Sequence, residues 1–326
     1  MFMKRRIICV LLLVFSLFNI FNLKTVFADE QIYLGGMPAG FSIETKGACI
    51  VGLSDVVTEN GIKSPSKEAG IQVGDTILSV DDYEVNNAFE LAECLKNSSD
   101  KLIKIKRKGE IILITVKPEK DVTGQYKLGV LIRENINGIG TITYIKGNTF
   151  ASLGHPIIDE SGCFMEIVSG NLFKCNITGC IKGERGKAGE LRGVFVKSNS
   201  IGSFTKNTDC GVFGKLDSNE IDYSKLTKVE TGHAVIGDAS IYSTVFGDSP
   251  KEYSISIIKV DDNLGTKNFV IKITDKNLLE ITNGIVQGMS GSPIMQNGKL
   301  VGAVTHVFTN DPTRGFGVSI DNMLNK

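Results

Sequence analysis

The segment Gly-Met-Ser-Gly-Ser-Pro at residues 288–293 precedes the apolar run Gly-Ala-Val-Thr at residues 302–305. Small residues around Ser290 let the backbone turn sharply, so the serine hydroxyl would stand exposed at the turn. The same turn would leave the backbone N–H groups of Gly288 and Ser290 free to bind an oxyanion. Because clusters of Gly, Ser and Pro also form ordinary turns, other parts of the chain must support the interpretation of Ser290 as a nucleophile.

The composition favours a mainly β protein and gives no electrostatic reason to expect nucleic-acid binding. The 326 residues include 36 basic and 36 acidic residues, so the formal net charge is zero, whereas nucleic-acid-binding domains usually present a basic surface. The length is sufficient for two domains with separate cores. Gly, Val, Ile and Thr are frequent in the second half, which favours strands joined by turns.

Residues 1–28 have the pattern of an export signal or a signal-anchor. A positively charged start is followed by an apolar run over residues 7–18 and by a small-residue cleavage motif that ends at Ala28. The apolar run is short for a stable membrane span, and the sequence leaves open whether the signal is removed. We expect membrane association through this segment until the chain is processed.

Six cysteines follow the signal, and export permits them to form disulfides. No Cys-x-x-Cys pair with a nearby histidine completes a tetrahedral metal site, so we expect neither a metal nor a cofactor. The sequence leaves the pairing of these cysteines open: Cys49, Cys94, Cys163, Cys175, Cys180 and Cys210.

Residues 34–118 resemble a PDZ domain of α+β type. The run Ala-Gly-Ile-Gln-Val-Gly-Asp-Thr-Ile-Leu-Ser-Val at residues 69–80 is its most specific feature, and a helix and two strands are expected after it, over residues 88–96, 102–107 and 111–116. In PDZ domains a loop binds the C-terminal carboxylate of a peptide, which adds to the sheet as a strand. The residues that match this loop are Gly40, Phe41, Ser42 and Ile43. The alternative is that Gly40 and Phe41 only begin a strand.

From about residue 125 to residue 326, short apolar stretches alternate with Gly-rich turns. This pattern predicts a β-sandwich or β-barrel. A helix is expected over residues 276–282, with Asp275 as its N-cap.

A serine hydroxyl needs a base that removes its proton, and the chain has three histidines. His306 lies inside an apolar strand and is interpreted as structural. His155 and His233 lie in similar turns, but the base of chymotrypsin-like chains lies far upstream of the serine, which favours His155. His233 is interpreted as structural or pocket-lining.

The acid that orients the base is not singled out by local pattern. Asp275 already has an explanation as a helix N-cap. The candidates are Asp159, Asp209, Asp217, Asp238, Asp248 and Asp275.

Several motifs together resemble the SpoIVB peptidase family: Leu-Gly-His-Pro at 153–156, Thr-Gly-His-Ala at 231–234, Ile-Thr-Asp-Lys at 273–276 and Gly-Ile-Val-Gln-Gly-Met-Ser-Gly-Ser-Pro-Ile at 284–294. The resemblance implies a mainly β chain in which a PDZ domain, residues 34–118, is followed by a chymotrypsin-like double β-barrel serine peptidase domain, residues 125–326. It makes His155 the base, Asp275 the orienting acid and Ser290 the nucleophile, with Gly288 and Ser290 as the oxyanion hole.

The resemblance also implies a cellular role. Members of this family are serine endopeptidases of sporulation signalling, exported across the forespore membrane into the space between two membranes. They cleave themselves and then a membrane-bound regulator of an intramembrane metalloprotease, which triggers activation of a late sigma factor. The expected partners are therefore this protein substrate, the chain itself and a peptide bound by the PDZ domain.

Two alternative functions remain at this point. One is a quality-control protease related to HtrA enzymes, although those enzymes place the PDZ domain after the protease. The other is a non-catalytic PDZ adaptor with a degenerate barrel.

Overall fold

A computed structural model of the chain describes residues 31–133, 135–158, 164–217, 219–220, 222–261 and 265–326. The predicted export signal lies outside these residues. Within the described part, no helix is long and apolar enough to cross a membrane.

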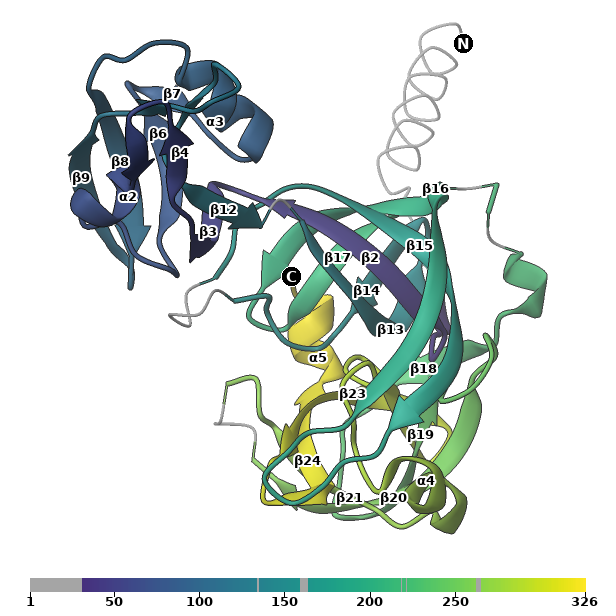
Figure 1. The fold of residues 1–326 in the computed structure, drawn as a ribbon. Coiled ribbons are helices and arrows are strands. Elements are labelled where there is room, and N and C mark those ends of the chain that lie inside the picture. The colour runs from purple at the N-terminus through teal and green to yellow at the C-terminus, as the bar shows by residue number, and fades with distance from the viewer. Residues whose placement is uncertain (1–30, 134, 159–163, 218, 221, 262–264) are drawn as a thin grey trace, which may run out of the picture. The chain divides into compact units, whose positions relative to one another are not determined.

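Six antiparallel strands close into a first barrel. Their order is β14-β17-β16-β15-β2-β13, and β13 pairs with β14 to complete the ring (Figure 1). Aromatic and aliphatic side chains such as Phe41, Phe150 and Leu172 fill its interior. The strands are β2 (Pro38–Thr45), β13 (Ile136–Lys146), β14 (Thr149–Ser152), β15 (Ile167–Ile181), β16 (Glu190–Thr208) and β17 (Gly211–Leu216).

Six further antiparallel strands form a second closed ring, in the order β23-β22-β19-β20-β21-β24 with β24 paired to β23. The side chains of β21 alternate in burial, as expected for a strand with one face in the core. Its core-facing residues are Phe269, Ile271 and Ile273. The strands are β19 (Gly237–Ser243), β20 (Lys251–Val260), β21 (Phe269–Ile273), β22 (Pro293–Gln296), β23 (Lys299–Phe308) and β24 (Asp311–Ser319).

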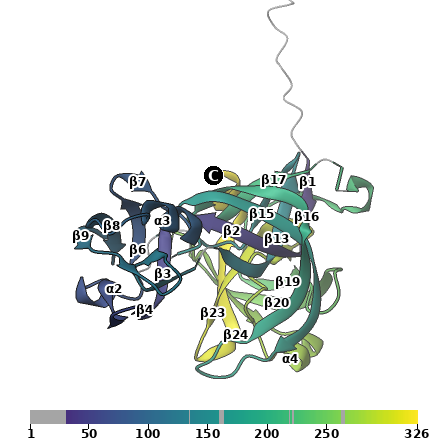
Figure 2. The ribbon, with the colours of Figure 1, turned by 45° about the horizontal axis from the view of Figure 1, so that its top comes forward.

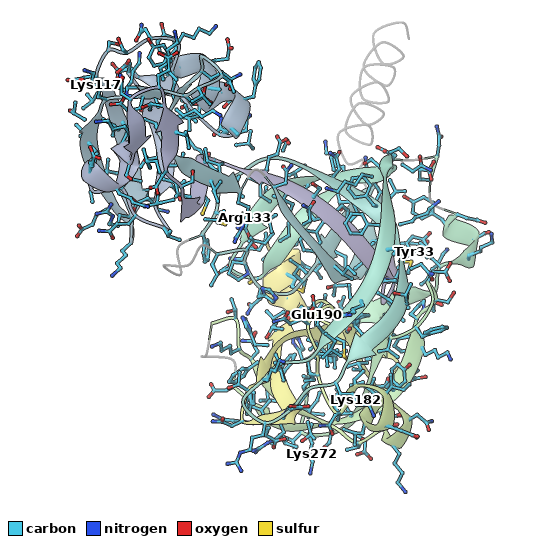
Figure 3. All side chains as sticks on the ribbon, in the orientation of Figure 1. Tyr33, Lys117, Arg133, Lys182, Glu190 and Lys272 are labelled. Atoms are coloured by element: carbon cyan, nitrogen blue, oxygen red, sulfur yellow. The ribbon has the colours of Figure 1, made fainter. Side chains whose placement is uncertain are left out.

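Two short strands and two long ones connect the rings. β1 (Ile32–Leu34) pairs with β13 and with β18 (Lys228–Thr231), which in turn pairs with β23. The long β15 and β16 extend beyond the first ring (Figure 2), so that Ile177 and Leu191 belong to the core of the second. Three short helices complete this part: η1 (Tyr223–Lys225), α4 (Lys276–Thr282) and α5 (Ile320–Leu324). Charged side chains such as Lys182 and Lys272 point outward (Figure 3).

Residues 46–133 form an inserted module with its own core, which includes Ile77, Ile105 and Leu128. Its main sheet has the order β12-β3-β6-β8-β9, with β7 paired to β6. The elements are β3 (Ala48–Leu53), β4 (Val56–Thr58), β5 (Gly61–Lys63), α2 (Pro65–Glu68), β6 (Thr76–Val80), β7 (Tyr83–Glu84), α3 (Ala88–Cys94), β8 (Lys101–Arg107), β9 (Glu110–Val116), β10 (Glu119–Lys120), β11 (Tyr126–Lys127) and β12 (Val130–Arg133).

The borders of this module differ from the predicted domain at residues 34–118. β1 and β2 belong to the barrel sheet, whereas β12 pairs with β3 and completes the module. The module therefore does not precede the first barrel but is inserted between its strands β2 and β13. The domain borders follow from where the apolar side chains are buried: Ile43 lies in the barrel core, and Leu128 lies in the module core.

The prediction that Gly40, Phe41, Ser42 and Ile43 form a peptide-binding loop is wrong. All four lie in β2, which pairs with β13 on one edge and with β15 on the other, so the strand offers no open edge to a peptide. Ile43 is fully buried. Gly40 is needed because a Cβ there would lie 2.3 Å from the ring of Phe195. The alternative interpretation of Gly40 and Phe41 as part of a strand is confirmed.

Candidate active site

The turn that carries Ser290 depends on two glycines. Gly288 and Gly291 have φ angles of 96° and 92°, a region that side chains rarely adopt. A Cβ on Gly291 would lie 2.2 Å from the carbonyl oxygen of Thr141, so backbone packs directly against this position. Met289 points the other way and is fully buried in the second core. The Gly-Met-Ser-Gly pattern is thus explained by a tight turn in which the methionine side chain is buried in the core.

Strand β13 of the first ring is hydrogen-bonded to the Ser290 turn, which belongs to the second ring. The N–H group of Thr141 donates to the carbonyl oxygen of Ser290 at 3.0 Å. The hydroxyl groups of Thr141 and Thr143 donate to the carbonyl oxygens of Gly288 and Gly291 at 2.8 and 2.7 Å. The nucleophile turn is therefore fixed where the two rings meet.

The backbone N–H groups of Gly288 and Ser290 make no hydrogen bond with any described residue, whereas their neighbours are engaged. Gln287 donates its N–H to the carbonyl oxygen of Gly189, and Met289 donates to that of Val286. The two donors expected for an oxyanion hole are thus available to a ligand in the part of the chain that the structure describes.

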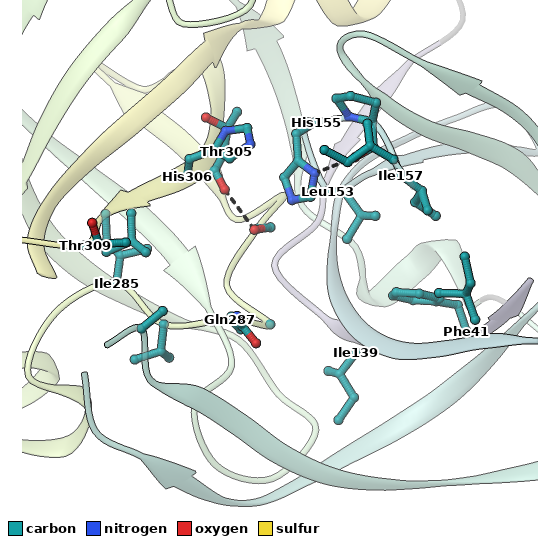
Figure 4. A pocket seen from close by; sticks show the side chains of 18 residues that line it. Phe41, Ile139, Leu153, His155, Ile157, Ile285, Gln287, Thr305, His306 and Thr309 are labelled. Carbon is teal, nitrogen blue, oxygen red and sulfur yellow. Dashed lines mark hydrogen bonds between the residues drawn. The ribbon is translucent and has the colours of Figure 1, made fainter. Parts of the chain in front are cut away.

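Of the two serines in this motif, Ser290 is the one that lines a cleft. Its hydroxyl donates to the carbonyl oxygen of Thr305 at 2.8 Å (Figure 4). Ser292 is fully buried, and its hydroxyl bonds to that of Ser243 at 3.0 Å. Ser292 has no access to a substrate, which supports the choice of Ser290.

His155 lies in the same cleft as Ser290. Strand β14 ends at Ser152, and the left-handed residues Leu153 and Gly154 (φ 68° and 67°) then turn the chain. Nδ1 of His155 lies 2.9 Å from the carbonyl oxygen of Pro156. Because a carbonyl can only accept, we assign the proton of the neutral ring to Nδ1. Nε2 is then left unprotonated, as a general base requires.

The pKa of His155 lies below its ordinary value of 6.5. Burial of the ring disfavours the charged form, and the hydrogen bond to the carbonyl of Pro156 opposes this effect more weakly. His155 is therefore neutral, and able to accept a proton, near neutral pH.

The other two histidines differ from what the sequence suggested about them. His233 does not line the cleft; its side chain is 88% exposed and lies 3.1 Å from the carboxylate of Asp321. His306 was interpreted as structural, yet it lines the cleft, and its ring centroid lies 4.8 Å from that of His155. The sequence feature that could have placed His306 in the cleft is its position directly after Thr305, in the strand that follows the nucleophile turn.

The structure does not bring Asp275 to His155. The carboxylate of Asp275 caps α4, where it accepts from the N–H group of Leu278 at 2.8 Å, and it lies 3.5 Å from the N–H group of Ser254. Asp275 does not line the cleft. Its orienting role therefore rests on the family resemblance alone.

The other candidate acids that the structure describes do not supply a partner for His155 either. Asp209 pairs with Lys326 at 2.9 Å, Asp159 lies outside the described residues, and Asp217, Asp238 and Asp248 do not line the cleft. Among the described residues, no carboxylate contributes to the pKa of His155.

The cleft around Ser290 has a volume of about 500 Å³. Among the described residues, none that lines it is Lys, Arg, Asp or Glu. Apolar side chains from both rings lie across it from one another, with Phe41 and Ile157 on one side and Ile285 on the other (Figure 4). Such a cleft suits an extended peptide with apolar side chains.

No cluster of three or more metal-ligating side chains occurs among the described residues. Within the same part of the chain, Cys94, Cys175, Cys180 and Cys210 form no disulfide, and Cys163 lies outside it.

A comparison with known families agrees with this geometry. The family model described as SpoIVB peptidase S55 matches residues 124–324, which is more than half of the chain and includes the histidine, the serine and both amides of the cleft. The chain thus belongs to the SpoIVB peptidase family and is a serine peptidase, a hydrolase that acts on peptide bonds.

Proposed function

We propose that this peptidase is an exported serine endopeptidase of sporulation signalling in which Ser290 is the nucleophile and His155 the general base. The observation that carries the catalytic assignment is the cleft itself. It collects Ser290 from the second ring and His155 from the first, beside two backbone N–H groups without a partner among the described residues.

The proposed reaction is acyl transfer to Ser290. Nε2 of His155 takes the hydroxyl proton while Oγ attacks the peptide carbonyl carbon, and the N–H groups of Gly288 and Ser290 stabilise the oxyanion. His155 then protonates the leaving amine, and a water molecule, activated in the same way, releases the acyl group. Before His155 can take its proton, the Ser290 hydroxyl must rotate away from the carbonyl of Thr305, to which it is hydrogen-bonded in the free protein.

The two rings suit a chymotrypsin-like arrangement, in which base and nucleophile come from different barrels. Support comes from the two closed sets of six antiparallel strands and from the hydrogen bonds of β13 to the nucleophile turn. By analogy, residues 305–307 of β23 would pair with the substrate backbone, because the pairing of β22 with this strand ends at Ala303. The carbonyl of Thr305, once released by Ser290, is then available to a substrate N–H.

We propose that the carbonyl of Pro156 does part of the work usually done by a triad aspartate. It fixes the Nδ1–H tautomer of His155, which is one of the two roles of that aspartate. It carries only a partial charge, so it stabilises the imidazolium less well. A base with a lowered pKa is consistent with this arrangement.

Family membership and the export pattern of residues 1–28 support the proposed signalling role. The proposed substrates are the chain itself and a membrane-bound regulator of an intramembrane metalloprotease, cleaved in the space between the forespore and mother-cell membranes. Self-cleavage is proposed in the segment that links the export pattern to the first strand of the barrel. Because β1 begins at Ile32 and is paired on both edges, we place the cleavage before residue 32.

A peptide-binding role of the inserted module remains a proposal, with a different location. In its main sheet, β12 is an edge strand that pairs with β3 alone among the described strands. An open strand edge can bind an extended peptide through backbone hydrogen bonds. We therefore propose β12, in place of Gly40–Ile43, as the strand to which a peptide would add.

Intact-mass measurements on purified protein test the proposed endopeptidase activity. The wild-type chain should lose an N-terminal segment ending before residue 32, whereas Ser290→Ala protein should stay intact. Wild-type protein should then remove the same segment from added Ser290→Ala protein, which shows cleavage between molecules. Loss of this segment from Ser290→Ala protein alone would contradict the proposal.

A further inference from the structure

The feature that the proposed mechanism has not used is the contact between two imidazole rings. The centroids of His155 and His306 lie 4.8 Å apart, and the ring planes are inclined by 39°. His155 follows strand β14 of the first ring of strands, and His306 lies in β23 of the second. Both side chains line the cleft that contains Ser290 (Figure 4).

A general base must be fixed in orientation as well as in tautomer, because a misplacement of about 1 Å can cost about a hundredfold in rate. The bond from Nδ1 of His155 to the carbonyl of Pro156 fixes the tautomer and one direction. A single hydrogen bond still allows the ring to rock about that contact. Aromatic rings with centroids 4.5–7 Å apart pack favourably in tilted arrangements, so a second ring can restrict this motion.

The ring of His306 is neutral near neutral pH, although the residue is exposed to solvent. Its pKa is lowered to about 4, first by desolvation and then by the nearby His155 and Lys267. Among the described residues, these two are the ionisable groups that influence His306, and none influences the pKa of His155. His306 therefore places no positive charge beside the imidazolium that forms during catalysis.

We propose that His306 is a positioning residue for the base: its neutral ring packs against His155 and holds that imidazole with Nδ1 on Pro156 and Nε2 open to Ser290. The inference rests on the proposed function of His155 and Ser290. It assigns the packing role to the aromatic ring as a whole, since no described residue forms a hydrogen bond with the ring nitrogens of His306.

Two consequences follow for His155 if the ring of His306 is removed. The imidazole gains freedom, so Ser290 is activated less often. Water also reaches the exposed face, which weakens the desolvation that lowers the pKa of His155 and moves this pKa up toward 6.5. A planar apolar ring at position 306 should preserve both orientation and desolvation.

The test measures how fast an alkyl fluorophosphonate labels Ser290 between pH 4.5 and 8.5, which requires no knowledge of the substrate. His306→Ala protein should be labelled about tenfold more slowly or worse at pH 7.5, with the acidic midpoint of the profile shifted upward. His306→Phe protein should stay within about threefold of wild type and keep the lower midpoint. His233→Ala protein, which loses an exposed histidine, is the matched control and should behave as wild type.

The inference would be overturned by a wild-type rate and profile in His306→Ala protein, or by equal losses in the Ala and Phe variants. Circular dichroism and thermal unfolding must show that each variant is folded. If the Ala variant is not, His306→Gln, which has no ring, replaces it with the same expectation. Failure of wild-type protein to react at Ser290 would instead contradict the proposed function.

Discussion

At the scale of single residues, access to the cleft distinguishes serines and histidines whose sequence surroundings are similar. Ser290 lines the cleft, whereas Ser292 is buried and hydrogen-bonded to Ser243. The turns that contain His155 and His233 are locally similar, and only chain order and the family resemblance favour His155. The fold supplies the distinction, since only a tertiary structure can show that His155 shares a cleft with Ser290 and that His233 faces solvent.

The role of His155 is tested by comparing two alanine variants. His155→Ala should lower the rate of peptide hydrolysis or of fluorophosphonate labelling by about 10²–10⁴-fold, the usual contribution of a general base. His233→Ala should change it little, because this side chain is exposed and lies outside the cleft. Labelling kinetics on both folded variants provide the measurement, and comparable losses in the two would leave His155 without its assigned role.

The pH dependence of the reaction should reflect the lowered pKa of His155. A lowered pKa means that the ring binds a proton only at more acidic pH, so the active neutral form persists below pH 6.5. The labelling rate should therefore remain on its plateau down through pH 6.5 and decline at lower pH. A midpoint above 6.5 in the rate profile would show that burial is not the dominant influence on this ring.

At the scale of elements, helix α4 shows how one residue can carry two interpretations. The sequence predicted both the helix at residues 276–282 and its Asp275 cap, and the structure confirms both. The catalytic interpretation of the same carboxylate came from the family resemblance, and no contact in the structure supports it. A cap can be recognised from neighbouring residues, whereas a triad acid is defined by a distance between segments that sequence alone does not provide.

Two variants of Asp275 separate these roles. Asp275→Ala should lower the free energy of unfolding by about 1 kcal/mol, because the first turn of α4 loses its cap. Asp275→Asn should preserve the cap, since asparagine caps helices about as well, and should keep most of the labelling activity. Urea unfolding and labelling of both proteins give the answer. A folded Asn variant with a large loss of activity would restore Asp275 as the orienting acid.

At the scale of the whole molecule, the main surprise is where the inserted module begins and ends. The helix and strand patterns within the module were predictable because they are local: the strands expected at residues 102–107 and 111–116 correspond closely to β8 and β9. The assignment of β2 to the barrel was not predictable from local pattern. Its partners lie far away in sequence: Ile136, opposite Ile43, is about ninety positions away, and Leu172, opposite Phe41, is more than a hundred.

This topology predicts that the module can be removed but β2 cannot. Ile43 lies opposite Ile136 in neighbouring antiparallel strands, so a short Gly-rich turn can join β2 to β13 in place of residues 46–135. The shortened protein should unfold cooperatively and react with fluorophosphonate at Ser290.

The matched comparison is a protein that starts at Gly124 and so contains the whole family match. It lacks β1 and β2, the second of which is paired on both edges within the first barrel, and should not fold. Circular dichroism and thermal unfolding test both proteins. A folded protein that starts at Gly124 would show that β2 is dispensable and would contradict the topology.

The central claim is that Ser290, activated in a cleft shared with His155, is the nucleophile of this peptidase. The most direct measurement treats folded wild-type and Ser290→Ala proteins with a fluorophosphonate probe and maps the modified residue by peptide mass spectrometry. The account predicts one adduct on Ser290 in the wild type, its loss on prior denaturation, and no adduct in the variant. An unmodified Ser290 in folded wild-type protein, or an adduct on Ser292 in its place, would contradict it.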